Sequence, residues 1–404
     1  MRLRPLLHPT LLVALLPALA AAQPTPAAAI DRARLVSRVV TRGVQAGGFP
    51  GASVAMGTSN TMLLQLGFGR TAWGGGGSDV SARGTAYDLA SLTKVVATTS
   101  AIMLLVDDGK IRLDDPVARH LSEFRGDGRD RITIRDVLMH RAGLPSGPDL
   151  RGTSSVSEAR SAVLRTQLAY PPRSRSLYSD VGPIVLGLLA ERVAGEPLEE
   201  MVGRRVFGPL GMRATRFGAP AGYAVAPTRD NAPAGMVHDP NAQRLGGTAG
   251  HAGLFSTAAD LARFARMLLG GGMLDDVRIF GDSTVALFTH RQAGGRPLGW
   301  DMCLGGGRCG LLMSDATFGH TGFTGTALWI DPEQDVFVIF LSNAVHGPHA
   351  YDNIAVLTDV RADLADLAVR AAADDSGAIP LRLRSEVAIN WFRQGATPRS
   401  LSGN

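Results

Sequence analysis

Lysine is almost absent from this chain of 404 residues, because only Lys94 and Lys110 stand among its 41 basic residues. Every other basic residue is arginine, so a retained lysine raises the question of what arginine could not do at that position. Arginine stays protonated in proteins, whereas a desolvated lysine can lose its proton and serve as a base. The scarcity of lysine therefore directs attention to Lys94, which follows Ser91 by three residues.

Cysteine is equally scarce, since Cys303 and Cys309 are the only two in the chain. Their spacing, with no cluster of histidines nearby, does not match that of a metal site. In an oxidising compartment a local disulfide across the glycine-rich turn between them is favoured over two free thiols.

Long apolar runs and clusters of positive charge are also missing. Beyond the first 22 residues no stretch reaches the roughly 18 apolar residues that a membrane-spanning helix requires. The net charge of +5 is not gathered into a basic run or an aromatic-basic patch. These absences exclude a transmembrane anchor and disfavour nucleic acid as a partner.

Residues 1–22 have the pattern of a cleavable signal peptide. Arg2 and Arg4 supply a positive start, and residues 11–22 form a short apolar segment that ends in small residues. We therefore expect a periplasmic or secreted protein. At the other end, residues 376–404 form a mostly polar tail with no recognisable role.

Ser91 and Lys94 form a Ser-x-x-Lys motif at the start of an apolar, helical run. Side chains three residues apart on a helix lie on the same face with Cβ atoms about 5–6 Å apart, so the lysine amine can reach the serine hydroxyl. A motif this short also occurs by chance in surface segments. Its meaning depends on what accompanies it.

A second motif, Tyr178-Ser179-Asp180, precedes the helical run that begins at Val181. A tyrosine at such a position can serve packing alone. A phenol near a lysine ammonium, however, has a lowered pKa and can act as a general base.

A third motif, from Gly319 to Gly325, contains His320-Thr321-Gly322 and is expected to open a strand that runs to Ile330. Glycines weaken a strand unless another backbone or a ligand must approach closely. A substrate laid against this strand would explain them.

The order of elements predicts an α/β fold. Strands are expected near both ends of the chain and helices between them, so both chain ends should build one antiparallel sheet flanked by helices, with an inserted all-helical subdomain. The domain should span residues 31–375. The expected strands are residues 52–56, 62–68, 298–302, 324–330 and 336–342; helices are expected at 31–46, between 91 and 290, and at 351–373, with capping boxes at Thr133/Asp136 and Thr257/Asp260.

The three motifs, in this order, resemble those of the penicillin-recognising serine hydrolases, which include class C β-lactamases, D,D-peptidases and related esterases. The similarity extends from about residue 31 to 372 and is strongest to the branch that includes penicillin-binding protein 4B. Further segments that look like this family are residues 87–90, 138–145, 209–212, 250–257 and 328–332.

The resemblance implies that Ser91 is the acylated nucleophile and that Lys94 and Tyr178 share its proton. Asp180 stands where many members have asparagine, and as an anion it would favour a charged lysine and shift the role of base toward Tyr178. The backbone N–H groups of Ser91 and Phe323 would form the oxyanion hole. The substrate-binding residues are then expected to be Asp180, His320, Thr321, Gly322 and Phe323.

His320 replaces the lysine of the Lys-Thr-Gly motif found in β-lactamases and D,D-peptidases. Histidine ordinarily titrates near ~6.5, so it is mostly neutral at neutral pH and anchors a substrate carboxylate less well than lysine. We therefore expect short uncharged esters to be preferred, with Arg141 or Arg173 as the alternative determinants of selectivity. Pro171-Pro172-Arg173 also departs from the Pro-Gly that is common before the tyrosine.

Together these features predict an exported serine hydrolase that forms an acyl-enzyme on Ser91 and hydrolyses ester or amide bonds in the manner of an esterase. A D,D-carboxypeptidase or weak β-lactamase is the alternative within this class. A penicillin-binding or other ligand-binding protein with little turnover is the alternative outside it, but a pure binder needs no lysine base. The expected partner is a small ester, amide or peptidoglycan-derived substrate, without cofactor or metal; the oligomeric state is not predicted.

Overall fold

The computed structural model describes residues 26–74, 76–303, 308–347, 350 and 352–374. The predicted signal peptide, residues 1–22, and the predicted tail, residues 376–404, lie outside the described residues. Within the described ranges, no helix combines the length and apolar character needed to cross a membrane.

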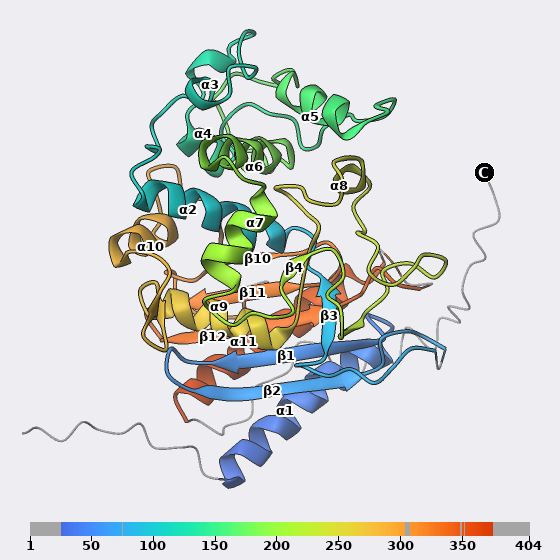
Figure 1. The fold of residues 1–404 in the computed structure, drawn as a ribbon. Coiled ribbons are helices and arrows are strands. Elements are labelled where there is room, and N and C mark those ends of the chain that lie inside the picture. The colour runs from blue at the N-terminus through green and yellow to red at the C-terminus, as the bar shows by residue number, and fades with distance from the viewer. Residues whose placement is uncertain (1–25, 75, 304–307, 348–349, 351, 375–404) are drawn as a thin grey trace, which may run out of the picture.

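The main sheet has six strands, each antiparallel to its neighbours, in the order β2-β1-β12-β11-β10-β9 (Figure 1). The N-terminal and C-terminal parts of the chain meet where β1 pairs with β12, from Ala52 opposite Ser342 to Gly57 opposite Phe337. The predicted fold class is thereby confirmed. The strands are β1 (Gly51–Gly57), β2 (Met62–Gly69), β9 (Asp301–Met302), β10 (Phe318–Thr321), β11 (Ala327–Asp331) and β12 (Val336–Ser342).

Helices cover both faces of this sheet. On β1, Val54 and Met56 belong to the core that includes α1 (Pro26–Gln45) and α11 (Ile354–Ala372). Ala55, which points to the opposite face, belongs to the second core together with α9 (Ala258–Leu269). Because both faces are covered, β12 is a continuous apolar run with every residue buried.

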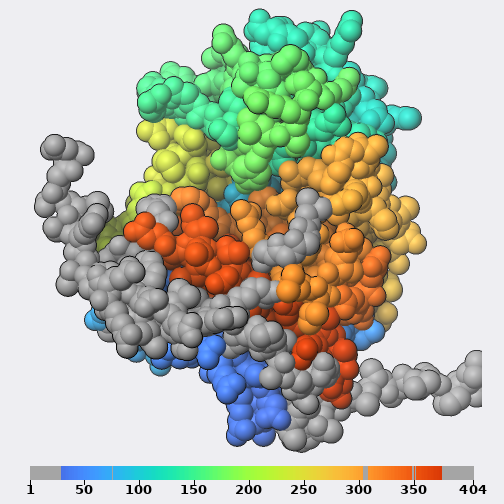
Figure 2. Space-filling model, turned by 180° about the vertical axis from the view of Figure 1, so that it is seen from behind, coloured from blue at the N-terminus to red at the C-terminus, as the bar shows by residue number. Residues whose placement is uncertain are grey.

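The predicted helical subdomain lies on one side of the sheet and forms the upper lobe in Figure 1. From behind, Figure 2 shows this lobe above and α11 below it. Its helices are η1 (Lys94–Thr99), α2 (Ser100–Asp107), α3 (Val117–His120), η2 (Arg129–Arg131), α4 (Ile134–Leu138), α5 (Val156–Leu164), α6 (Val181–Ala194), α7 (Leu198–Val202) and η3 (Gly203–Phe207), followed by α8 (Pro240–Arg244) and, after α9, α10 (Asp282–Thr289).

The two predicted capping boxes differ in outcome. Thr133 and Asp136 form a complete box at the start of α4. Thr257 caps α9 by accepting from the Asp260 N–H, but the Asp260 carboxylate accepts from Ala214 N–H and Thr215 instead of turning back to Thr257. The second box was therefore predicted wrongly, because the Asp260 carboxylate binds residues that are distant in the sequence.

Short strands complete the fold. A four-stranded sheet has the order β4-β6-β3-β5, and its central strand β3 leads directly toward Ser91. A separate hairpin joins β7 to β8. The ranges are β3 (Thr85–Asp88), β4 (Arg216–Phe217), β5 (Ala224–Val225), β6 (Leu254–Ser256), β7 (Met273–Leu274) and β8 (Val277–Arg278).

The strand predicted from residue 324 to 330 was wrong at its start. His320 lies on β10, and the chain then turns back tightly before β11 begins at Ala327. The Gly322 N–H donates to the Thr326 carbonyl at 2.7 Å, and Gly325 adopts a left-handed φ of 111° that favours glycine. Similarly, the strand predicted at residues 298–302 shortens to Asp301–Met302, because Gly299 has a φ of 83° and bonds to the Leu138 carbonyl.

Candidate active site

Ser91 lies in the turn between β3 and η1, at the edge of a cavity. The turn is held from below by the buried Asp88, which accepts hydrogen bonds from the Ala90 N–H at 2.8 Å and the His238 N–H at 2.7 Å. Burial raises the pKa of the Asp88 carboxyl to about 6, although the two backbone N–H donors oppose this shift. Ala90 itself has a φ of 47°, an unfavourable conformation for a residue with a Cβ atom. The backbone that presents Ser91 is therefore fixed by its surroundings.

Lys94 reaches Ser91 as the spacing predicted. Its Nζ atom lies 2.8 Å from Ser91 Oγ, 2.8 Å from Asp180 Oδ1 and 3.1 Å from the His251 carbonyl oxygen. Only 2% of the lysine is exposed. Lys94 thus donates hydrogen bonds to Ser91 and to the His251 carbonyl and forms an ion pair with Asp180.

The charge of Lys94 follows from these neighbours. Burial lowers its pKa, but the charges and hydrogen bonds of Tyr178 and Asp180 outweigh burial and raise the pKa above its ordinary value. Lys94 is therefore an ammonium at neutral pH. The effect anticipated for an anionic Asp180 is present, and a neutral lysine is not the resting form.

Tyr178 places its hydroxyl 2.9 Å from Ser91 Oγ, on the approach to α6. The ring lies between two imidazoles, with centroids 5.0 Å from His140 and 5.8 Å from His320, and Lys94 Nζ is 5.1 Å from its centre. The side chain remains 40% exposed. It can therefore meet both the nucleophile and a substrate in the cavity.

His320 lies on β10 with 4% of its surface exposed. Its Nδ1 atom is 2.7 Å from the Thr321 carbonyl oxygen, so Nδ1 carries the proton and Nε2 is left as an acceptor. Burial, together with the nearby positive charge of Lys94, lowers the pKa of His320 to about 4. The imidazole is accordingly neutral at neutral pH, as the sequence predicted.

The turn after β10 packs against the Ser91 segment. Thr324 Oγ1 donates to the Asp88 carbonyl at 2.7 Å, and Thr326 Oγ1 donates to the Leu89 carbonyl at 3.0 Å. A Cβ atom on Gly322 would overlap both Thr326 Oγ1 and the Leu89 carbonyl oxygen. Close approach of the Leu89 backbone therefore accounts for glycine at Gly322, and the expected substrate contact stays a prediction.

The cavity beside Ser91 has a volume of about 490 Å³. It brings together Ser91 and Tyr178 with all four residues predicted on and after β10, namely His320, Thr321, Gly322 and Phe323; Phe323 is 61% exposed. Lys94 and Asp180 are not part of the lining, and Lys94 lies buried next to Ser91.

The sequence analysis missed three arginines that line this cavity: Arg296, Arg308 and Arg361. The two arginines that it named lie outside the lining, where Arg173 pairs with Asp136 at 2.7 Å and Arg141 donates to the Arg173 carbonyl at 2.9 Å. Arg361 stands among other charged residues of α11, including Asp359 and Asp363, so the sequence carried no signal for it. Arg308 and Arg296 lie in loops and carried no signal either.

His238 and His251 lie beside the site and support it through backbone groups. The His238 N–H supports Asp88, and the His251 ring lies 3.0 Å from Asp239 Oδ1 while its carbonyl accepts from Lys94. Despite burial, hydrogen bonding to His251 lowers the pKa of Asp239 to about 2. Across the described part of the chain, no group of three or more histidine, cysteine, aspartate or glutamate side chains could hold a metal ion.

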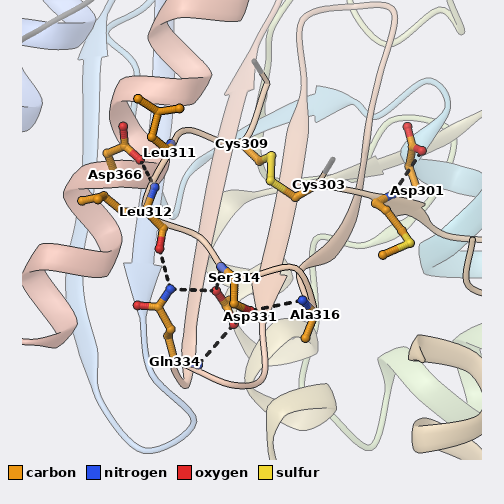
Figure 3. The surroundings of a disulfide bond; sticks show 11 residues. Asp301, Cys303, Cys309, Leu311, Leu312, Ser314, Ala316, Asp331, Gln334 and Asp366 are labelled. Atoms are coloured by element: carbon orange, nitrogen blue, oxygen red, sulfur yellow. Dashed lines mark hydrogen bonds between the residues drawn. A yellow bond between two sulfur atoms is a disulfide. The ribbon is translucent and has the colours of Figure 1, made fainter. Parts of the chain in front are cut away.

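Cys303 and Cys309 form a disulfide, as predicted (Figure 3). The segment that follows is docked on α11, because Asp366 Oδ1 accepts from the N–H groups of Leu311 at 2.7 Å and Leu312 at 2.8 Å. The disulfide therefore closes the loop that carries Arg308, and Asp366 holds the segment after Cys309 on the helix that carries Arg361.

Comparison with known proteins agrees with this architecture. A model of the Beta-lactamase family matches residues 36–361. A protein of Escherichia coli O157:H7, named as a candidate D-alanyl-D-alanine carboxypeptidase, is 31% identical over 371 residues, which cover 80% of this chain and 84% of the relative. A Salmonella agona protein of the same name is 34% identical over 306 residues, covering 66% and 71%.

Solved structures share the fold at low sequence identity. A penicillin-binding protein homologue from Caulobacter crescentus has a TM-score of 0.68 at 21% identity, covering 83% of this chain and 98% of that one. A family VIII carboxylesterase has a TM-score of 0.68 at 20% identity, covering 84% and 97%. The family match and the curated relatives together decide the assignment: this chain belongs to the Beta-lactamase family and is a serine hydrolase.

Proposed function

We propose that this hydrolase acts through an acyl-enzyme on Ser91. The observation that carries the proposal is the position of Ser91 Oγ, which lies 2.8 Å from Lys94 Nζ and 2.9 Å from Tyr178 Oη at the edge of the cavity. A hydroxyl held between an ammonium and a phenol has both a nearby positive charge and a proton acceptor, as an activated nucleophile requires.

Tyr178 is the proposed base. In the resting site both the Lys94 ammonium and the Tyr178 hydroxyl donate to Ser91 Oγ. Once Tyr178 has lost its proton, Ser91 can donate to the phenolate through the same contact, while Lys94 still donates to Ser91 Oγ. Tyr178, as the phenolate, takes the serine proton while Ser91 Oγ attacks the substrate carbonyl, and then delivers it to the leaving group as the scissile bond breaks. Water then attacks the acyl-enzyme carbonyl and gives a proton to Tyr178. Tyr178 passes this proton to Ser91 Oγ as the acyl–oxygen bond breaks, which releases the acid and restores Ser91.

The oxyanion of each tetrahedral intermediate would be held by the backbone N–H groups of Ser91 and Phe323. The hydrogen bonds from Thr324 and Thr326 to the Asp88 and Leu89 carbonyls support this proposal, because they join the turn that carries Phe323 to the segment that carries Ser91.

For the substrate, we propose a peptide that ends in D-alanyl-D-alanine, from which the terminal residue is released. Support comes from the names of the curated relatives and from the arginines in the cavity, which suit a carboxylate-bearing substrate. The neutral His320 favours a second candidate, a short uncharged ester, because a neutral imidazole binds a substrate carboxylate less well than a lysine would.

We further propose that residues 1–22 direct export and that residues 31–375 form the hydrolase domain. An exported enzyme would meet a peptidoglycan-derived substrate outside the cytoplasm. A penicillin-binding protein with little turnover remains an outcome of the experiment below.

The experiment joins labelling with turnover. Intact-mass analysis after a fluorophosphonate probe should show one adduct that is lost in Ser91→Ala. The wild-type protein is then assayed on acetyl-D-alanyl-D-alanine, a p-nitrophenyl ester and nitrocefin. Labelling that persists in Ser91→Ala would refute the nucleophile, and labelling without turnover of any substrate would identify a binding protein. Turnover of the ester alone would select the second candidate.

A further inference from the structure

Arg361 is a buried cation on the wall of the catalytic cavity. It lies within α11 with 8% of its surface exposed, and it lines the same cavity as Ser91. Its Nη2 atom donates to the Thr326 carbonyl at 3.1 Å, whereas its buried Nε atom has no acceptor. Among the described residues, no carboxylate forms an ion pair with it.

This arrangement is costly to the folded protein. Burial, together with the positive charge of Arg308, lowers the pKa of Arg361 to about 9. The carboxylate in the lining, Asp301, lies 3.9 Å from Arg296 and forms no ion pair with Arg361 or Arg308 among the described residues. A buried charge normally persists only where it is paired. An anion that enters with the substrate would supply the missing partner.

Arg308 approaches the cavity from another element. Its side chain is exposed, the disulfide of Cys303 with Cys309 closes its loop, and the Asp366 carboxylate holds the segment after Cys309 on α11 (Figure 3). Arg296 differs from both, since it donates to the Trp300 carbonyl at 2.9 Å and has Asp301 at 3.9 Å. Its charge is partly compensated within the protein.

We propose that Arg361 and Arg308 form an anion-binding subsite that selects substrates carrying a carboxylate. The inference rests on the proposed acyl-enzyme function and adds the residues that determine its specificity. In this chain the cation for the substrate carboxylate then comes from α11 and the disulfide loop, and β10 offers only a neutral imidazole. A guanidinium binds carboxylate through paired hydrogen bonds, which makes arginine suited to this role.

The test compares two substrates that differ in one charge: acetyl-D-alanyl-D-alanine and its C-terminal amide. Arg361→Gln and Arg308→Gln should each lower kcat/KM for the acid by about ten- to a hundredfold, mainly through KM, because a charge-assisted hydrogen bond is lost. The kcat/KM for the amide should fall much less. Arg370→Gln, the same change near the end of α11 and outside the cavity lining, serves as the matched control.

Thermal unfolding separates recognition from structure. Arg361→Gln should keep or raise the melting temperature, because it removes an unpaired buried charge while retaining a donor for the Thr326 carbonyl. A lowered melting temperature with equal losses on acid and amide would overturn the subsite and make Arg361 structural. If Arg361→Gln does not fold, the test uses Arg308→Gln, because Arg308 is exposed. An equal ratio of kcat/KM for the acid to kcat/KM for the amide in Arg308→Gln and wild type would refute the proposal.

The failure of this subsite is distinct from failure of the proposed function. Fluorophosphonate labelling of Ser91 does not require a carboxylate, so labelled enzyme with unchanged acid-to-amide preference in both variants would reject the subsite alone. Protection of Ser91 from the probe by free D-alanine, weakened in Arg361→Gln and Arg308→Gln but not in Arg370→Gln, would support it without any turnover.

Discussion

Lys94 Nζ and Asp180 Oδ1 lie 2.8 Å apart, with only 2% of the lysine exposed. A lone buried ammonium would tend to lose its proton, but the adjacent carboxylate reverses that tendency and the pKa of Lys94 is raised. The lysine therefore acts as a fixed positive charge beside Ser91 and Tyr178. This relationship supports the proposal that Tyr178, and not Lys94, accepts the serine proton.

Replacing Asp180 by asparagine should shift the pH dependence of the enzyme. Loss of the anion lowers the pKa of Lys94, so the ammonium is lost at a lower pH. The alkaline limb of the kcat/KM profile should then move to lower pH by about 1–3 units, the range for removal of an opposite charge at this distance. Asp149→Asn, an exposed carboxylate paired with Arg151, is the control. An unmoved alkaline limb in Asp180→Asn would show that Lys94 ionisation does not limit catalysis.

Lys94→Arg should be as damaging as Lys94→Ala, with a loss of rate on the order of 10²–10⁴. A planar guanidinium cannot place its donors on Ser91 Oγ, Asp180 Oδ1 and the His251 carbonyl in the space left by a compact ammonium. Single-turnover acylation by a p-nitrophenyl ester measures the effect directly. Retained activity in the arginine variant would mean that positive charge alone is sufficient.

His320 should make the protein less stable in acid. Its pKa is lowered to about 4 in the folded state, whereas the unfolded chain takes up a proton near ~6.5. The unfolded state therefore binds more protons between these values, and this group's contribution to the free energy of unfolding falls as the pH drops, by about 1.4 kcal/mol per unit. Urea unfolding at pH 7 and pH 5 should show a smaller acid loss in His320→Gln than in wild type.

His140 lies in the same region, and burial lowers its pKa well below the ordinary value, so part of the acid loss remains in the His320 variant. The test therefore compares how steeply the free energy of unfolding falls with pH in wild type and in His320→Gln. Identical slopes in wild type and His320→Gln would contradict the lowered pKa. The same shift predicts that KM for acetyl-D-alanyl-D-alanine does not improve between pH 7 and pH 5, since His320 stays neutral there.

Breaking the disulfide should affect both stability and recognition. Cys303 and Cys309 close a short loop, so replacing both by serine should cost about 2 kcal/mol of unfolding free energy. The loop that carries Arg308 would lose its covalent closure, so KM for the acid substrate should rise while that for its amide changes less. A thiol reductant should reproduce both effects in wild type and neither in the double-serine variant. Equal KM changes on both substrates would show that the loop does not position Arg308.

The sequence predicted the parts of the fold that depend on local pattern. The strand from Val336 to Ser342 was predicted with its correct bounds, because burial on both faces leaves a continuous apolar run from Val336 to Leu341. Ser91 and Lys94 were placed together correctly, because their contact depends on spacing within one turn.

Long-range contacts account for the errors. The break between β10 and β11 depends on a turn packed against Leu89, more than 230 residues earlier. The Arg361 side chain faces a cavity that exists only where α11 meets the turn before β11. An arginine among other charged residues of a helix ordinarily indicates a solvent-exposed face, so nothing local to Arg361 revealed its position.

Gly322→Ala should separate the two walls of the active site. The added Cβ atom would overlap the Leu89 carbonyl oxygen and Thr326 Oγ1, so the turn that carries Phe323 must move away from the segment that carries Ser91. Overpacking of this kind costs about 1–3 kcal/mol of stability, and a displacement near 1 Å lowers the rate by about 10². Gly147→Ala is the matched control, because its Cβ atom would meet no atom within 4 Å. Deacylation and acylation should both slow in Gly322→Ala, since both require the oxyanion donors. Normal kcat in a folded Gly322→Ala enzyme would show that the Phe323 N–H does not contribute to the oxyanion hole.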